Sequence, residues 1–141
     1  MTLIKHRILA ATLAAGLALA CASAQAQGAL QAYPAAAVAF LDAELPKMDT
    51  AVAAKDRAYF IGAMERMNKF LDAWGLQRNT AVLEAWPMCT DAVTDFQIVG
   101  LCRLSPPGTI CEPGTFIPKF ENNLARCRAA AGMPAKPASR P

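Results

Sequence analysis

The sequence has almost no histidine: the only one among its 141 residues is His6, close to the N-terminus. Ser-His-Asp and Cys-His catalysis both use histidine as the base, and histidine is also the commonest metal ligand. If the N-terminal segment containing His6 is removed on export, neither kind of catalysis is open to the remaining chain. An enzyme built on it would have to use carboxylates, tyrosine or a cofactor.

A block of like charge is also missing. The chain has 14 lysines and arginines against 11 aspartates and glutamates. Lys5 and Arg7 lie in the segment that we expect to be removed, which leaves 12 basic residues and a nearly neutral mature chain. Nucleic-acid binding needs a clustered basic face, so we expect no nucleic-acid partner.

Long apolar runs are absent except near the N-terminus. Lys5 and Arg7 precede an uninterrupted apolar run over residues 8–20, and small residues follow over 22–26. These are the three parts of a secretory signal peptide, and the run is shorter than the roughly 20 residues that span a bilayer. We expect residues 1–26 to be a signal peptide and the mature protein to be periplasmic or secreted, without a transmembrane helix.

Cys21 leaves a second interpretation open. Residues 18–20 before it are similar to a lipobox, in which Cys21 would be lipidated and become the new N-terminus. The usual lipobox has a larger aliphatic residue where this sequence has Ala18. We therefore favour cleavage after Ala24 or Ala26, with Cys21 discarded.

Four cysteines remain after cleavage, and none of them forms a Cys-x-x-Cys pair. An even number in a short exported chain predicts two structural disulfides rather than a redox or zinc site. Residues 89–102 are expected to be helical, which would separate Cys89 from Cys102 by roughly 20 Å, whereas a disulfide needs Cα atoms within about 7 Å. If an antiparallel helix ends at Cys127, the pairs are Cys89–Cys127 and Cys102–Cys111.

Apolar residues recur at helical spacing, while runs of β-branched residues and Asn-Gly turns are missing. The predicted fold is all-α: a small bundle of four to five helices stapled by two disulfides, with an irregular Pro/Gly loop between the last two helices. The domain is expected to span residues 27–128, followed by a disordered tail over 129–141. The expected helices run from Pro34 to Pro46, from Asp49 to Trp74 with Gly75 as cap, from Asn79 or Thr80 to Trp86, from Cys89 to Cys102, and from Thr115 to Cys127.

The loop over residues 105–114 is the favoured binding element. Prolines, glycines and a disulfide should make it stiff and exposed, and rigid loops lose little entropy on binding. We expect it to contact a protein partner in the cell envelope through Pro106, Pro107, Ile110 and Glu112. The alternative is that proline and glycine only form the turn and that Ile110 folds inward.

Asp91 and Asp95 lie one turn apart at the start of a predicted helix, with Glu84 nearby in the sequence. Paired carboxylates can bind a cation or share a proton. Acidic residues in the first turns of a helix are also favoured by its dipole alone, and this second interpretation is the one we prefer.

Two apolar groups have both a functional and a structural interpretation. Thioether sulfurs select Cu(I), but methionine is also a common filler of cores, and tryptophans can line an apolar groove or simply pack inside. For both groups we favour the core, and we expect neither a metal nor a cofactor. The residues concerned are Met64, Met67 and Met88 in the first group, and Trp74 and Trp86 in the second.

The stretch from Cys89 to Cys127, in which residues 111–115 read Cys-Glu-Pro-Gly-Thr before a helix, resembles the small periplasmic Tai-type immunity proteins. Those are helical, disulfide-stapled inhibitors of secreted toxins that cleave the cell wall. The resemblance covers under a third of the chain, and the Gly-Tyr pattern expected after the first cysteine is missing at residues 90–92. The resemblance implies that this protein inhibits a toxin of that kind, as an immunity protein does.

Together these observations predict a periplasmic binding or adaptor protein without catalytic activity. The main alternative is a carrier of a small ligand or lipid, which requires an apolar cavity between the helices that bear Trp74 and Trp86. A third hypothesis is an enzyme that works through Asp91, Asp95 or Glu84.

Overall fold

The computed structural model describes residues 28, 30–78, 80–105 and 111–133. The expected signal peptide and Cys21 therefore lie outside the described residues. The chain divides into two compact units, Met1–Gln31 and Ala32–Pro141. The described residues of the first unit (28, 30 and 31) are helical, and the second unit contains the hydrophobic core. No helix among the described residues is long and apolar enough to cross a membrane.

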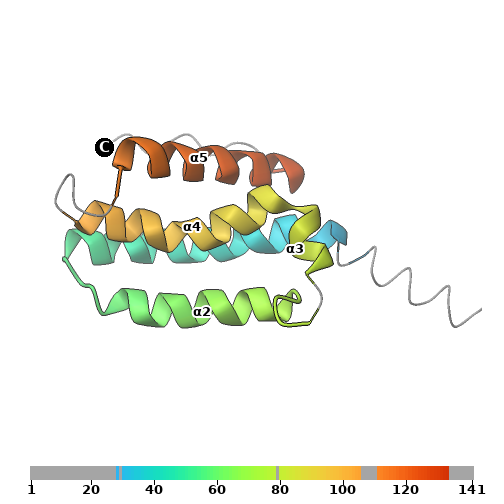
Figure 1. Ribbon diagram of the computed structural model, residues 1–141, viewed down its shortest axis with the longest axis horizontal. Coiled ribbons are helices and arrows are strands. Elements are labelled where there is room, and N and C mark those ends of the chain that lie inside the picture. Colours follow the sequence, from blue (N-terminus) through green and yellow to red (C-terminus); the bar gives the residue numbers. More distant parts are fainter. Residues whose placement is uncertain (1–27, 29, 79, 106–110, 134–141) are drawn as a thin grey trace, which may run out of the picture. The chain divides into compact units, whose positions relative to one another are not determined.

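The described residues form five helices and no strand, which confirms the predicted all-α fold. In the second unit, four long helices alternate in direction along the chain, and a short helix lies in the connection before α4 (Figure 1). The helices are the first one over residues 30–53, α2 (Tyr59–Ala73), α3 (Ala81–Ala85), α4 (Pro87–Leu104) and α5 (Pro113–Ala130).

The first helix differs from the prediction at both ends. Residues 30–33 are already helical, so Pro34 does not begin it, and it continues through Pro46 to residue 53. A proline inside a helix removes an N–H donor and costs roughly 3 kcal/mol. Leu41, Met48 and Ala51 are buried on one continuous face that spans Pro46. Because burial of this face outweighs the cost of the proline, the predicted end at Pro46 is wrong.

The single helix predicted over residues 49–74 is also wrong, because the chain turns at Lys55. Lys55 has a φ of 55°; its N–H donates to the Val52 carbonyl at 3.1 Å, and the Asp56 N–H donates to the Ala51 carbonyl at 2.8 Å. This is the Schellman arrangement that ends helices, usually with glycine in the left-handed position. Asp56 Oδ1 then accepts hydrogen bonds from the backbone at the start of α2.

Gly75 ends α2 as predicted, with a φ of 106° and a hydrogen bond from the Leu76 N–H to the Leu71 carbonyl at 3.0 Å. The last two helices each begin two residues before their predicted starts, with Pro87 and Pro113 in their first turns. Proline is favoured there because the N–H that it lacks would have no partner inside the helix.

Aromatic rings hold the first helix against α2 and α4. Tyr33 meets Trp74 edge-on, with ring centroids 5.2 Å apart, and Phe40 stacks on Phe70 at 4.7 Å. Phe40 also meets Phe96 of α4 edge-on at 5.7 Å. Such aromatic pairs contribute about 0.5–1.5 kcal/mol each beyond the area that they bury, so this cluster is a major part of the core.

Both predicted disulfides are present in the structure. Cys89 and Cys127 join α4 to α5 with Cα atoms 4.8 Å apart, and Cys102 and Cys111 join the end of α4 to the residues before α5 with Cα atoms 5.2 Å apart. We call them the buried disulfide and the corner disulfide. The antiparallel arrangement of α4 and α5 (Figure 1) explains the nested pairing, since each bond joins the two helices at one of their ends.

Candidate functional site

Most of the predicted binding loop falls in the part of the chain that is not described. Pro106, Pro107 and Ile110 lie outside the described residues, and only Glu112 is described. Its side chain is exposed and it occupies the N-cap position of α5. The loop's role in binding therefore stays a prediction.

The acidic residues of α4 form contacts between helices. Lys119 Nζ of α5 lies 3.0 Å from Asp95 Oδ2, in an ion pair whose geometry does not make a directed hydrogen bond to that oxygen. Asn123 Nδ2 donates to Asp91 Oδ2 over 3.5 Å. The contact with Asp95 raises the pKa of Lys119. Within the described residues, no group of three or more His, Cys, Asp or Glu side chains could hold a metal ion, and Asp91 and Asp95 act here in helix packing.

The methionines and tryptophans do not gather at one site. Met64 is half exposed, whereas Met67 and Met88 are partly buried against the core, so Met64 is the one expected core methionine that the core does not cover. Trp74 and Trp86 also pack against the core, and the ring of Tyr33 occupies the space beside Trp74.

A buried carboxylate that the sequence did not single out organises the polar contacts between the first helix and α2. Glu44 is 3 % exposed. Arg66 donates to both of its oxygens, from Nε to Oε1 at 3.0 Å and from Nη2 to Oε2 at 2.8 Å. The Tyr59 hydroxyl donates to Oε2 at 2.9 Å, and Lys47 Nζ donates to Oε1 at 2.8 Å. Four donors therefore satisfy this carboxylate.

The same network shifts the pKa of its members. Burial by itself would raise the pKa of Glu44, but the hydrogen bonds from Arg66, Lys47 and Tyr59 outweigh it and lower the pKa to about 2. Burial and then the hydrogen bond to Glu44 raise the pKa of Tyr59 to about 12. Both groups keep one protonation state across the physiological range, so the network stabilises the fold and supplies no general acid or base near neutral pH.

An open depression of about 330 Å³ lies beside this network, lined by Lys47, Thr50, Ala51, Ala54, Asp56 and Tyr59. Its charged groups have opposite sign, and Asp56 already accepts backbone hydrogen bonds. The depression brings no nucleophile next to a base, and nothing in it selects one class of ligand.

Exposed apolar side chains are a more specific feature. Ile61 and Met64 on α2 are 69 % and 50 % exposed, and Ile98 and Leu101 on α4 are 39 % and 40 % exposed. Each pair is spaced by three residues, so its members lie on one side of their helix. Single exposed apolar residues need no explanation, but grouped ones often mark interaction sites.

The two pairs lie at the same level along the bundle. Gly100 lets Phe60 approach so closely that a Cβ at position 100 would lie 2.5 Å from its ring. Ile61 directly follows Phe60, and Leu101 directly follows Gly100, so both are at this crossing. Leu101 is also adjacent to Cys102, so the apolar pairs lie toward the end of the bundle that carries the corner disulfide. We call Ile61, Met64, Ile98 and Leu101 the apolar quartet.

The sequence carried a signal for only part of this arrangement. Met64 fits the helical repeat of core positions, but α2 buries Phe60, Ala63 and Leu71 and leaves Met64 half exposed. Spacing alone does not say which of these positions the rest of the fold covers. Glu44 lies within a helical repeat of apolar residues. A charged residue at such a position indicates a buried charge, so this signal was present in the sequence. Comparisons with known families, with curated proteins and with solved structures found no match for this chain.

Proposed function

We propose that this protein binds a protein partner in the periplasm or a similar oxidising compartment and has no catalytic activity of its own. The observation that carries the proposal is the apolar quartet, two pairs of exposed apolar side chains on α2 and α4 that lie at the same level along the bundle. Elsewhere in the described residues, buried charges are paired within the fold, as at Glu44 and Asp95. The quartet is therefore the best candidate for a surface that is completed by another molecule.

Two further features support binding rather than catalysis. The quartet lies on packed helices, one of which, α4, carries a cysteine of each disulfide, and a rigid surface loses little conformational entropy when a partner docks. The carboxylates that could have served an enzyme, Asp91 and Asp95, face α5 and contact its polar side chains.

Immunity-type inhibition of a toxin that cleaves the cell wall is one specific form of this proposal. It rests on the resemblance of residues 89–127 alone. This form predicts that the purified protein inhibits such an enzyme at a one-to-one ratio.

Site-directed photocrosslinking in the cell envelope of the protein's own host tests the proposal. A photoreactive amino acid would be placed at Ile61, Met64, Ile98 or Leu101 in turn. Glu121 and Arg126, which are exposed on α5, would be the control positions. We expect an adduct of one defined mass from the quartet positions and little from the controls.

A pair of charge variants then separates binding from folding. I61E and L101E should weaken the crosslink at the remaining quartet positions while the midpoint of urea unfolding changes little, because both side chains are already exposed. Adducts that are equally strong at Glu121 and Arg126, or absent from all four quartet positions, would refute the proposed surface.

A further inference from the structure

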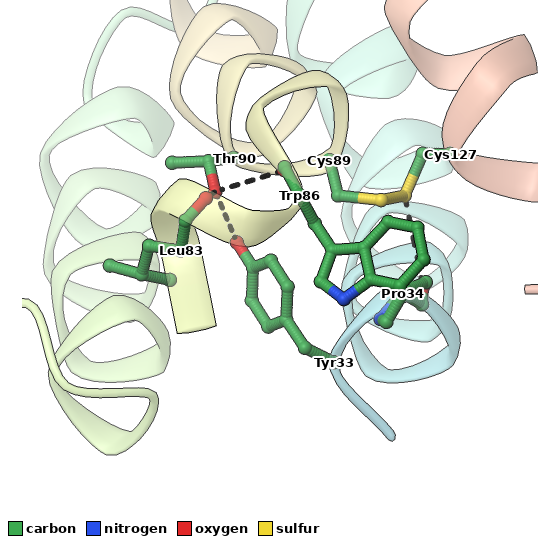
Figure 2. The surroundings of a disulfide bond; sticks show 7 residues. All are labelled: Tyr33, Pro34, Leu83, Trp86, Cys89, Thr90 and Cys127. Carbon is green, nitrogen blue, oxygen red and sulfur yellow. Dashed lines mark hydrogen bonds between the residues drawn. A yellow bond between two sulfur atoms is a disulfide. The ribbon is translucent and has the colours of Figure 1, made fainter. Parts of the chain in front are cut away.

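The two disulfides differ in their access to solvent. Cys89 and Cys127 are both 0 % exposed, and their bond lies among Trp86, Pro34 and the surrounding helices (Figure 2). In the corner disulfide, Cys102 is 3 % exposed, but the Cys111 side chain is partly exposed. Thiol–disulfide exchange requires a thiolate to reach a sulfur, so Cys111 is the cysteine best placed to react while the core stays folded.

We propose that the corner disulfide is a thiol-exchange site, at which Cys111 Sγ takes up an external thiolate and Cys102 is the leaving group. In the first step the thiolate bonds to Cys111 Sγ, the Cys102–Cys111 bond breaks, and its electron pair leaves on Cys102 Sγ, which takes a proton from water. A second thiol then attacks the external sulfur of this mixed disulfide and releases Cys111 as a thiolate. The corner disulfide is reduced by two electrons, and the two external thiols are oxidised to a disulfide.

The fold should survive this reaction. The corner disulfide closes a short connection, with its cysteines nine positions apart in the sequence. The same two helices remain joined by the buried disulfide and by the ion pair between Lys119 and Asp95. Opening the corner bond therefore leaves the two helices joined. The co-reactant that we propose is a small thiol, and the site is independent of the proposed binding function.

The test treats the oxidised protein with reduced glutathione in native buffer, traps free thiols with N-ethylmaleimide at successive times, and maps the products by peptide mass spectrometry. We expect glutathione on Cys111 and maleimide on Cys102, at a rate at least about tenfold above any modification of Cys89 or Cys127, because attack on the latter pair requires the core to open. The far-ultraviolet circular dichroism of the reacted protein should equal that of the untreated protein.

The same reaction in concentrated guanidinium chloride is the control, since unfolding exposes all four cysteines. There the two disulfides should open at comparable rates. Any of three outcomes would overturn the proposal: glutathione found on Cys102 instead of Cys111, equal rates for both disulfides in native buffer, or a rate difference that persists in denaturant.

Discussion

Tyr33 of the first helix is hydrogen-bonded to Thr90 of α4, 57 positions later, with 3.0 Å between their hydroxyl oxygens. Thr90 Oγ1 also lies 2.8 Å from the Leu83 carbonyl and 3.3 Å from the Trp86 carbonyl, so its only hydrogen is donated to these backbone oxygens. The Tyr33 hydroxyl must therefore donate to Thr90 (Figure 2). Two side chains thus connect the first helix, α3 and α4 beside the buried disulfide, and burial raises the pKa of Tyr33.

Removing one partner of this pair should be measurable. Y33F keeps the ring and loses the donor, which should lower the free energy of unfolding by about 1 kcal/mol. T90V should cost more, about 1–3 kcal/mol, because it leaves the buried Tyr33 hydroxyl without an acceptor. Urea unfolding of both variants and of the double variant gives the coupling energy. Strictly additive losses would show that the two hydroxyls do not interact.

Stability should fall in acid because of Glu44. Its pKa is lowered from 4.5 to about 2 in the folded protein, so its contribution is fully present above pH 4.5 and is lost as the pH falls through 2. We expect the lowered pKa of Glu44 to contribute about 2 kcal/mol to the free energy of unfolding at neutral pH. This is less than the full pKa shift would give, because Arg66 and Lys47 are half exposed and screened by solvent.

Urea unfolding between pH 7 and pH 2 measures this contribution. E44Q should be less stable at pH 7 and should lose less stability than the parent on acidification. E65Q, which changes an exposed glutamate of α2, is the control. Parallel pH profiles for E44Q and the parent would contradict the assignment.

Gly100 should tolerate no side chain. A Cβ there would lie 2.5 Å from Phe60 and 2.7 Å from Met48 Sδ, so G100A should cost about 1–3 kcal/mol through overpacking. G114A is the matched control, because a Cβ at that position has nothing within 4 Å, and alanine is favoured over glycine in a helix by up to about 1 kcal/mol. If thermal unfolding shows that G100A is as stable as G114A or more stable, then α2 and α4 do not cross at Gly100.

Replacing Lys55 with glycine should stabilise the protein. The left-handed backbone at this position costs an L-residue roughly 1 kcal/mol that glycine does not incur. K55G should therefore raise the free energy of unfolding, by less than about 1 kcal/mol because glycine also gains entropy in the unfolded chain. G75A, made at the corresponding position after α2, should lower it by a similar amount. A destabilised K55G would show that the Lys55 side chain contributes more than its backbone strain removes.

The two disulfides should contribute unequally to stability. Their cysteines are 38 and 9 positions apart, and the loop-entropy relation gives about 4 and about 2.5 kcal/mol. C89A/C127A should thus be the less stable double variant, and more so because it also leaves a gap in the core. Guanidinium unfolding under non-reducing conditions measures the free energy of unfolding of both double variants. A larger loss of stability for C102A/C111A than for C89A/C127A would contradict the prediction.

The sequence by itself determined the helical class and the disulfide pairing. The length of the helix over residues 89–102 excludes a Cys89–Cys102 bond, and an antiparallel last helix, which a short connection favours, then selects the nested pairs. Gly75 readily takes the positive φ that its position requires. These features follow from local backbone preferences and covalent geometry, so they can be read without knowing what packs where.

Only the tertiary structure decided where the long helices begin and end, and which charges are buried. Pro46 lies inside a helix because a continuous face around it packs on the core, and Lys55 takes a position usually held by glycine because the chain must turn back there. Glu44 can be buried because Tyr59 and Arg66 of α2 reach it from another helix. Ile61 and Met64 are exposed because α2 turns Phe60, Ala63 and Leu71 to the core. Each of these outcomes depends on contacts between helices, which local sequence preferences do not encode.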